Sequence, residues 1–377
     1  MTGLYLHIPF CQRRCVYCDF YSTILGAAER GRYVDALCRE LAGRADEAAG
    51  RRLASVYMGG GTPSQLAPAE LERLLHTVWA VYEVAPDAEV TLEANPDDLT
   101  PDYVAALAAL PVNRVSLGVQ TFDDDALRLL RRRHTGRQAV AAVESLARAG
   151  VDNLSVDLIY GLPGQTLAQW EADLDRALAL PVAHLSAYAL IYEEGTELWQ
   201  MRSRGEVDEA SDELSLALFE RLMDRTARAG FEHYEISNFA LPGRRARHNT
   251  AYWTGAPYIG CGPGAHSYDG GACRRRNLPD LRAYLDASPS VPHEVEHLTP
   301  DEQFNDLILT SLRMADGLRL DRVEARFGTD ALGEVMRTAR PHLGAGRMAM
   351  KDGVLRLTRR GLFVSDDVMS DFMRISD

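Results

Sequence analysis

The sequence is short of cysteine, of basic charge and of long apolar runs. It holds 6 cysteines in 377 residues, and 41 Lys and Arg stand against 54 Asp and Glu, which leaves a net charge of −13. An acidic chain does not attract nucleic acid or anionic lipid over a broad surface. We therefore expect no nucleic-acid partner, and any such contact would have to be local.

No stretch approaches the roughly 18 consecutive apolar residues of a membrane-spanning helix. The opening residues, MTGLYLHIPF, lack the basic segment and apolar core of a secretory signal. We therefore expect a cytoplasmic protein without a membrane span. Low-complexity tracts and a clear fixed-period repeat are also missing, and the 46% apolar content is typical of a globular chain with a sizeable core.

Short β-rich runs alternate with helical patterns from residue 4 to about residue 190. This alternation predicts an α/β fold with a parallel sheet, arranged as a doubly wound sheet or as a full or partial (β/α) barrel. The strand candidates are residues 4–8, 54–58, 89–94, 114–119, 153–160 and 184–191.

Unusual residues gather at the carboxyl ends of these predicted strands. In a barrel, that end is the reaction face, and one site built from many strands favours the barrel over an open sheet. The segments are a cysteine-rich loop after the first strand, GGGTP (59–63), EANP (93–96), GVQTF (118–122) and DLIYGLPGQ (157–165).

The pattern divides the chain into three parts. Residues 1–232 form the predicted barrel, and residues 233–297 form an extension that we expect to close it. Residues 298–377 form a smaller, mostly helical, winged-helix-like module, with a hairpin turn at KDG (351–353). DNA binding by this module is disfavoured against a packing role because the chain is acidic.

Three of the cysteines, Cys11, Cys15 and Cys18, fall within eight residues as Cys-x3-Cys-x2-Cys. In a reducing compartment such spacing is more typical of metal ligands or redox thiols than of disulfides, and short Cys spacings hold iron–sulfur clusters. Zinc is the alternative, but it needs a fourth ligand and usually a second Cys or His pair. His7 could serve, although it lies in the preceding strand, where a packed histidine is more common.

This cysteine motif, in a loop after the first strand of a (β/α) barrel, resembles that of the radical S-adenosylmethionine (SAM) superfamily. The resemblance implies a partial (β/α)6-type barrel and a [4Fe–4S] cluster held by Cys11, Cys15 and Cys18. The amino and carboxylate groups of SAM would chelate the fourth iron, an open Lewis-acid position. Reductive cleavage of SAM would also require an electron donor for the cluster.

Seven ordered motifs narrow the resemblance to the coproporphyrinogen III dehydrogenase (HemN) family and its relative, the HemW-type heme chaperones. They are YLHIPFCQRRCVYCDFYS, GGGTPS, LEANP, SLGVQTF, RRRHT, VDLIYGLPGQT and GCGPGAHSY. The resemblance implies a SAM pocket made of Tyr5, Tyr17, Gly60, Gly61, Thr62, Glu93, Gln120, Arg132, Asp157 and Ala189.

Two of the residues assigned to the SAM pocket could have another role, and one further residue matches the family pattern less well. Glu93 could be a cap or a salt-bridge partner, and Arg132 could belong to a solvated basic helix edge. His266 matches a SAM-contact position less well, because the dehydrogenase pattern carries an apolar residue there.

This sequence differs from the dehydrogenase pattern in two ways, and both differences favour the HemW-type proteins. Phe20 stands where the dehydrogenase has a fourth cysteine, and Cys11 leaves no room for the substrate-binding extension that precedes its cysteine loop. The stretch HNTAYW (248–253) resembles a motif associated with heme in HemW-type proteins. The resemblance implies that His248 ligates heme iron while Tyr252 and Trp253 contact the macrocycle. The alternative is a loop histidine beside core aromatics.

The expected function is heme binding and delivery to acceptor hemoproteins. The alternative is an oxygen-independent coproporphyrinogen III oxidase in porphyrin biosynthesis, and no catalytic residue is assigned for it. Radical chemistry on an RNA base or a peptide is a third option, but RRRH (131–134) and GRRAR (243–247) are too short to support the RNA version. The sequence leaves open whether the chain forms a homodimer.

Overall fold

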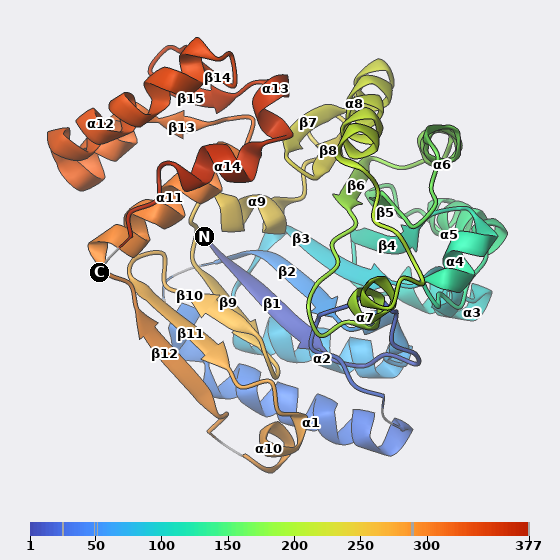
Figure 1. The fold of residues 1–377 in the computed structure, drawn as a ribbon. Coiled ribbons are helices and arrows are strands. Elements are labelled where there is room, and N and C mark those ends of the chain that lie inside the picture. Colours follow the sequence, from blue (N-terminus) through green and yellow to red (C-terminus); the bar gives the residue numbers. More distant parts are fainter. Residues whose placement is uncertain (25, 49, 51, 288–289, 376–377) are drawn as a thin grey trace.

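A strongly curved sheet runs through the molecule in the computed structural model, which describes residues 1–377 except 25, 49, 51, 288–289 and 376–377 (Figure 1). Twelve strands of the described chain form it, in the order β12-β11-β10-β9-β1-β2-β3-β4-β5-β6-β8-β7. The predicted α/β class with a parallel sheet is confirmed.

The centre of the sheet is parallel and follows the predicted β-rich runs. Its strands are buried on both faces, as expected where helices cover a parallel sheet. They are β1 (Thr2–Ile8), β2 (Leu53–Gly60), β3 (Val84–Ala94), β4 (Arg114–Gln120), β5 (Leu154–Tyr160) and β6 (His184–Ala189).

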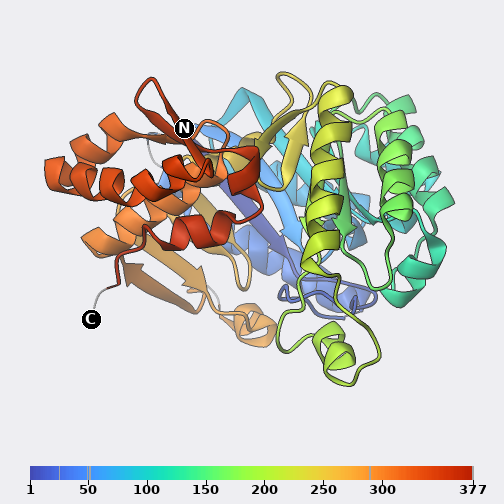
Figure 2. The same cartoon turned by 45° about the horizontal axis from the view of Figure 1, so that its top comes forward.

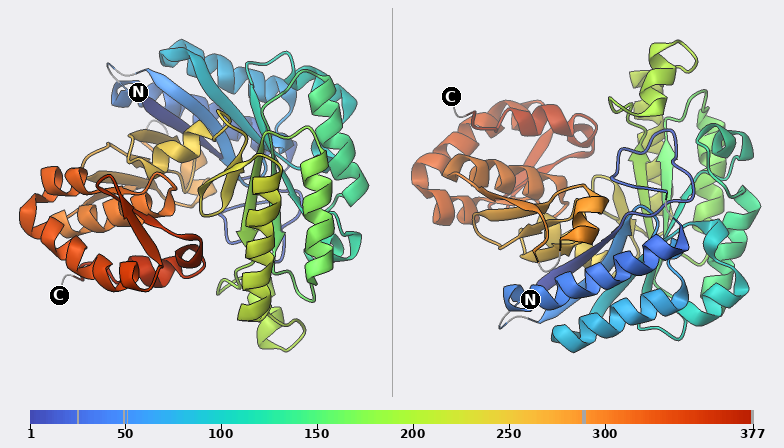
Figure 3. Two further views of the ribbon diagram at one scale, coloured as in Figure 1. Left: turned by 90° about the horizontal axis from the view of Figure 1, so that it is seen from above. Right: turned by 90° about the horizontal axis from the view of Figure 1, so that it is seen from below.

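Helices connect these strands and lie around the outside of the sheet (Figure 3). Several begin at threonine N-caps that form capping boxes, such as Thr135 with Gln138 and Thr166 with Gln169. Each cap stabilises its helix by about 1 kcal/mol. The helices are α1 (Ala27–Gly43), α2 (Pro68–Val81), α3 (Pro101–Leu107), α4 (Asp124–Leu129), α5 (Gly136–Arg148), α6 (Leu167–Ala179), α7 (Glu197–Ser203) and α8 (Asp212–Arg228). None of the described helices is long and apolar enough to cross a membrane.

The segment after α8 adds strands to both edges of the sheet. β7 (Glu232–Glu235) and β8 (Asn238–Ala240) lie beyond β6, while β9 (Tyr258–Cys261) pairs in parallel with β1. The remaining added elements are β10 (His266–Tyr268), β11 (Cys273–Asn277), α10 (Leu281–Asp286), β12 (His293–His297) and, between the two edges, α9 (Arg247–Trp253). α9 packs near the amino ends of β1 to β3, where Glu89 accepts hydrogen bonds from the backbone N–H groups of Arg247 and His248.

The carboxyl-terminal module has its own apolar core, built around Phe304, Leu312, Val335 and Phe372. It lies beside α9 and the β9–β12 edge (Figure 2). The predicted KDG turn joins β14 to β15, with Asp352 and Gly353 at positive φ. Its elements are α11 (Pro300–Arg313), β13 (Leu318–Arg319), α12 (Leu320–Gly344), β14 (Met348–Lys351), β15 (Val354–Leu357), α13 (Arg359–Leu362) and α14 (Ser365–Ser370).

A buried ion pair ties α1 to the added strands. Arg44 donates to Glu40 at 3.1 Å, and the two side chains are 5% and 1% exposed. Arg44 also donates to Ser267 of β10 at 2.8 Å. Glu40 accepts from the Gly262 N–H and the Tyr284 hydroxyl, both at 2.8 Å. The pair therefore satisfies polar groups from α1, the β9–β10 turn and α10 at once.

Removing one member of this pair should destabilise the fold strongly. We expect Glu40→Ala to lower the free energy of unfolding by about 3–5 kcal/mol, because it leaves the Arg44 charge buried without its partner. Glu40→Gln, which keeps one acceptor oxygen for these donors, should cost less. Urea denaturation measures both. The control is Glu144→Ala, which removes an exposed pair with Arg148 and should leave stability unchanged within error. Equal effects of Glu40→Ala and Glu144→Ala would contradict the assignment.

Candidate functional site

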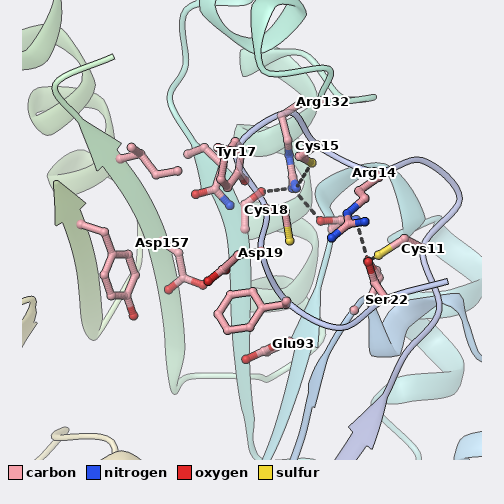
Figure 4. A pocket seen from close by; sticks show the side chains of 18 of the residues that line it. Cys11, Arg14, Cys15, Tyr17, Cys18, Asp19, Ser22, Glu93, Arg132 and Asp157 are labelled. Atoms are coloured by element: carbon pink, nitrogen blue, oxygen red, sulfur yellow. Dashed lines mark hydrogen bonds between the residues drawn. The ribbon is translucent and has the colours of Figure 1, made fainter. Parts of the chain in front are cut away.

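The cysteine loop between β1 and α1 lies over the carboxyl ends of the parallel strands (Figure 4). Cys11, Cys15 and Cys18 all line a first cavity of about 430 Å³ at this end of the sheet. Cys11 lies 3.4 Å from the Thr62 hydroxyl, next to the glycine loop after β2. The three thiols and the loop GGGTP are thus parts of one site, as the sequence predicted.

The first cavity collects almost all of the residues assigned to SAM. Tyr5 differs, because it lies deeper in β1 and lines a second cavity. The assigned residues that line the first cavity are Tyr17, Gly60, Gly61, Thr62, Glu93, Gln120, Arg132, Asp157 and Ala189. Sequence reasoning did not single out Asn95, Ser116 and Tyr188, which also line it. Asn95 directly follows a predicted strand, and that position was an available signal, whereas Ser116 and Tyr188 lie inside predicted strands and carried none.

The glycines after β2 are required by close packing. A Cβ on Gly60 would lie 2.6 Å from the His7 ring, and Gly60 has a φ of +110°. A Cβ on Gly61 would lie 2.8 Å from the backbone of Pro9. The cysteine loop can therefore approach this turn only because both positions lack a side chain. The turn presents backbone N–H groups to the cavity without obstruction.

Arg132 is half-buried within the site and does not belong to a solvated helix edge. Its guanidinium donates to the Cys15 sulfur at 3.5 Å and to the Asn95 side chain at 2.6 Å. Gly118 leaves room for it, since a Cβ there would lie 3.1 Å from the guanidinium and 2.9 Å from the Gln120 amide. The arrangement puts a fixed positive charge beside one of the cysteine sulfurs.

Two carboxyl groups, Glu93 and Asp157, line the first cavity (Figure 4). Glu93 accepts from the Tyr57 hydroxyl at 2.6 Å and from the Gly60 N–H at 3.2 Å. Burial raises the pKa of Glu93 to about 7; the Tyr57 hydrogen bond opposes the shift and Asp157 adds to it. Burial also raises the pKa of Asp157, against hydrogen bonds from Ser186 and Ser116. Glu93 is therefore poised to change charge near neutral pH.

The cysteine thiols fit a cluster better than a single ion. Burial raises the pKa of the Cys11 thiol and raises that of Cys18 to about 11, so a metal centre must displace their protons on binding. Among the described residues, no three His, Cys, Asp or Glu side chains converge closely enough to hold one metal ion. A cluster binds each thiolate at a different iron, so it does not require the three sulfurs to meet at one metal ion.

The histidine assigned to heme, His248, is buried at the amino ends of β1 and β2. Both of its ring nitrogens have partners: Nδ1 lies 2.8 Å from the Ser55 hydroxyl and Nε2 lies 2.8 Å from the Tyr252 hydroxyl. Its ring stacks on Tyr57 at a centroid distance of 5.0 Å. Burial lowers the pKa of His248 to about 3, so the imidazole is neutral.

Tyr252 and Trp253, the aromatic residues of the same motif, line the second cavity, whose volume is about 560 Å³. The α11 and α12 helices of the carboxyl-terminal module supply part of its wall, which no sequence pattern indicated. Phe20, which is 64% exposed, lines both cavities. The other side chains in the wall of the second cavity include Tyr5, His7, Tyr21, Tyr258, His266, Tyr268, Arg274, Asp306, Leu307, Thr310, Arg322 and Arg326.

Comparisons with known proteins agree with this geometry. Residues 5–177 match the radical SAM superfamily, and residues 298–364 match the HemN C-terminal domain. The heme chaperone HemW of Bacillus subtilis (strain 168) is 32% identical over 377 residues, covering 99% of each chain. That of Mycobacterium tuberculosis (strain H37Rv) is 38% identical over 376 residues, covering 97% of this chain and 93% of the relative. This chain belongs to the HemW family of the radical SAM superfamily.

The solved structure of HemN from Escherichia coli, a coproporphyrinogen III oxidase, has the same fold as this HemW-family protein. The TM-score is 0.85 at 24% identity, over 98% of this chain and 89% of HemN. Superfamily membership implies a [4Fe–4S] cluster and SAM, and the first cavity provides thiols, backbone donors and carboxylates suited to both.

Replacing one cluster cysteine should remove the iron–sulfur signal. After anaerobic reconstitution with iron and sulfide, we expect Cys15→Ala to lose the broad cluster absorption and at least about tenfold of its affinity for iron, because a ligand is missing. Cys38→Ala is the matched control, since Cys38 lies on α1 and accepts from Thr77 at 3.2 Å. Retention of the full signal in Cys15→Ala would refute the cluster assignment.

SAM binding should strengthen with pH through the titration of Glu93. A carboxylate accepts hydrogen bonds from hydroxyl groups better than a protonated acid does. With a pKa of about 7, Glu93 is mostly protonated at pH 6 and mostly ionised at pH 8. We expect the SAM dissociation constant, measured by calorimetry, to fall up to about tenfold over this range. Glu93→Gln should bind more weakly with a flat profile; an unaltered slope in this variant would assign the effect to another group.

Proposed function

We propose that this HemW-family protein binds heme and delivers it to acceptor hemoproteins, with a [4Fe–4S] cluster and SAM held in the first cavity. The observation that carries the proposal is the second cavity, which has aromatic walls and shares Phe20 with the first cavity. A flat, largely apolar macrocycle with charged edge groups matches such a wall.

In the first cavity, Cys11, Cys15 and Cys18 would hold the cluster. When bound, the cluster and SAM supply one-electron reductive chemistry, for which an electron donor is needed. The residues proposed to bind SAM contact different parts of the cofactor. Backbone groups of Gly60, Gly61 and Thr62 suit the amino and carboxylate ends, and Glu93 suits the ribose hydroxyls. The remaining groups of this proposed pocket are Tyr17, Gln120, Arg132, Asp157 and Ala189. Tyr5, which the sequence assigned to SAM, lines the second cavity and is left out of the pocket.

Phe20 supports heme handling over porphyrinogen decarboxylation. It occupies the position at which the HemN pattern carries a fourth cysteine, and its exposed ring adds apolar surface at the junction of the two cavities. An apolar ring cannot ligate a metal, but it can cover the face of a macrocycle.

The motif HNTAYW contributes to the proposed heme site through its aromatic residues. Tyr252 and Trp253 stand in the wall of the second cavity. His248 holds the Tyr252 hydroxyl at 2.8 Å and is itself held by Ser55. In this arrangement His248 positions Tyr252, and direct ligation of iron by His248 would first have to break one of these hydrogen bonds.

Heme binding and transfer test this proposal. Titrating heme into the anaerobic full-length protein should shift the Soret band, and the loaded protein should pass heme to an apo-hemoprotein. We expect Trp253→Ala to weaken heme binding about tenfold, the value of one lost aromatic contact. Trp79→Ala is the control, because Trp79 is 42% exposed on α2, outside the cavity. Urea denaturation verifies that both variants fold.

Two outcomes would overturn the proposal. One is a wild-type protein that shows no Soret shift with heme. The other is formation of protoporphyrinogen from coproporphyrinogen III, with SAM and reductant present, that disappears in Cys15→Ala. The second result would establish the porphyrin-oxidase alternative in place of the chaperone function.

A further inference from the structure

Three histidines lie at or behind the wall of the second cavity, and they differ in whether their ring nitrogens are occupied. In His7, Nδ1 lies 3.1 Å from the Tyr5 hydroxyl and Nε2 lies 3.0 Å from the Tyr21 carbonyl oxygen. In His248 both nitrogens are also hydrogen-bonded. The ring of His266 is exposed and forms no hydrogen bond with any residue that the structure describes. His266 therefore offers an imidazole to a ligand without breaking an existing contact.

The backbone of His266 is held rigidly on β10. A Cβ on Gly260, in the neighbouring strand β9, would lie 2.0 Å from the His266 carbonyl oxygen, so the two backbones are in close contact. His266 also pairs with Arg276 in the β10–β11 ladder. A ligand carried on a strand between two neighbours is well oriented before binding.

Another part of the cavity wall carries positive charge. Arg322 and Arg326 of α12 line it and form no ion pair with any described carboxylate. Arg322 donates to the Thr254 carbonyl oxygen at 3.3 Å, and Arg326 donates to the Gln303 side chain at 3.0 Å. Each guanidinium therefore keeps donors available for an incoming carboxylate. Arg274 is different, because Asp306 pairs with it.

We infer that heme binds in the second cavity with its iron on the imidazole of His266 and its propionates directed to Arg322 and Arg326. This inference rests on the proposed function and specifies where heme would bind. The cavity volume of about 560 Å³ falls in the range of small-molecule sites. Phe20 would then lie between the heme macrocycle and the first cavity.

The protonation state of His266 agrees with this role. Partial desolvation of the imidazole at the cavity wall lowers the pKa of His266, and the nearby charges of Arg276 and Arg274 lower it further, while Glu296 opposes them. The imidazole is therefore neutral at pH 7, the form that ligates metal ions.

The test compares histidine variants of the full-length protein with a reconstituted cluster, using ferric heme under anaerobic conditions. We expect His266→Ala to lose the spectroscopic signature of an imidazole-ligated heme in absorption and electron paramagnetic resonance, and to bind at least tenfold more weakly. Added free imidazole should restore the ligated spectrum. His76→Ala is the matched control, because His76 is an exposed histidine on α2 outside both cavities.

A second experiment tests the proposed contacts between the heme propionates and Arg322 and Arg326. The double variant Arg322→Gln/Arg326→Gln should bind heme several-fold more weakly than wild type and should no longer distinguish heme from its dimethyl ester. The wild-type protein should prefer the free acid. Equal preference for the two ligands in wild type would overturn the assignment of the arginines.

Failure of this inference and failure of the proposed function give different results. A wild-type protein that binds no heme refutes the function itself. Wild-type heme binding with an unchanged spectrum in His266→Ala refutes the ligand assignment but leaves the function intact. If the signature disappears instead in His248→Gln, with folding confirmed by urea denaturation, the iron ligand is His248 and the inference is wrong.

Discussion

The parallel hydrogen-bond register of β1 to β6 is the constraint on which the rest of the structure depends. In β1 and β2 the pairs are His7 with Gly59 and Ile8 with Gly60, so the cysteine loop and the glycine turn leave the sheet at the same level. Tyr160 pairs with Ala189 at the far side of the same edge. Because parallel strands present all their carboxyl ends together, residues from distant segments share one cavity. A shift by one residue would turn these side chains to the other face.

Burying polar groups in the first cavity lowers the stability of the fold, and hydrogen bonds to neighbouring residues offset this loss. Glu93 has Tyr57 and Gly60, and Arg132 has Asn95 and the Cys15 sulfur. An isolated buried charge would be far more costly, so each group is either paired or shifted in pKa. Glu93 and Asp157, whose pKa values are raised, lie where the chemistry of a radical SAM protein is expected.

Packing of the carboxyl-terminal module creates the second cavity. α11 and α12 bring Asp306, Leu307, Arg322 and Arg326 against aromatic residues of the sheet and of α9. The module is thus part of a cavity wall as well as a packing unit. Its guanidinium groups face a cavity whose other wall is largely aromatic, a combination suited to an amphiphilic flat ligand.

Apolar periodicity and motif spacing are local properties of the chain, so they predicted the α/β class, the six parallel strands and the cysteine motif from the sequence. The resemblance of the motifs to a known family added most of the residues of the first cavity. Tertiary structure decided the rest. HNTAYW is short, and no local pattern shows that Ser55 and Tyr252 occupy both nitrogens of His248. Nor does a local pattern show that the nitrogens of His266 have no partner among the residues that the structure describes. Nor could spacing place Tyr5 in the second cavity or α12 in its wall. Such contacts join residues far apart in the chain, so they depend on how the elements pack and not on what each element is.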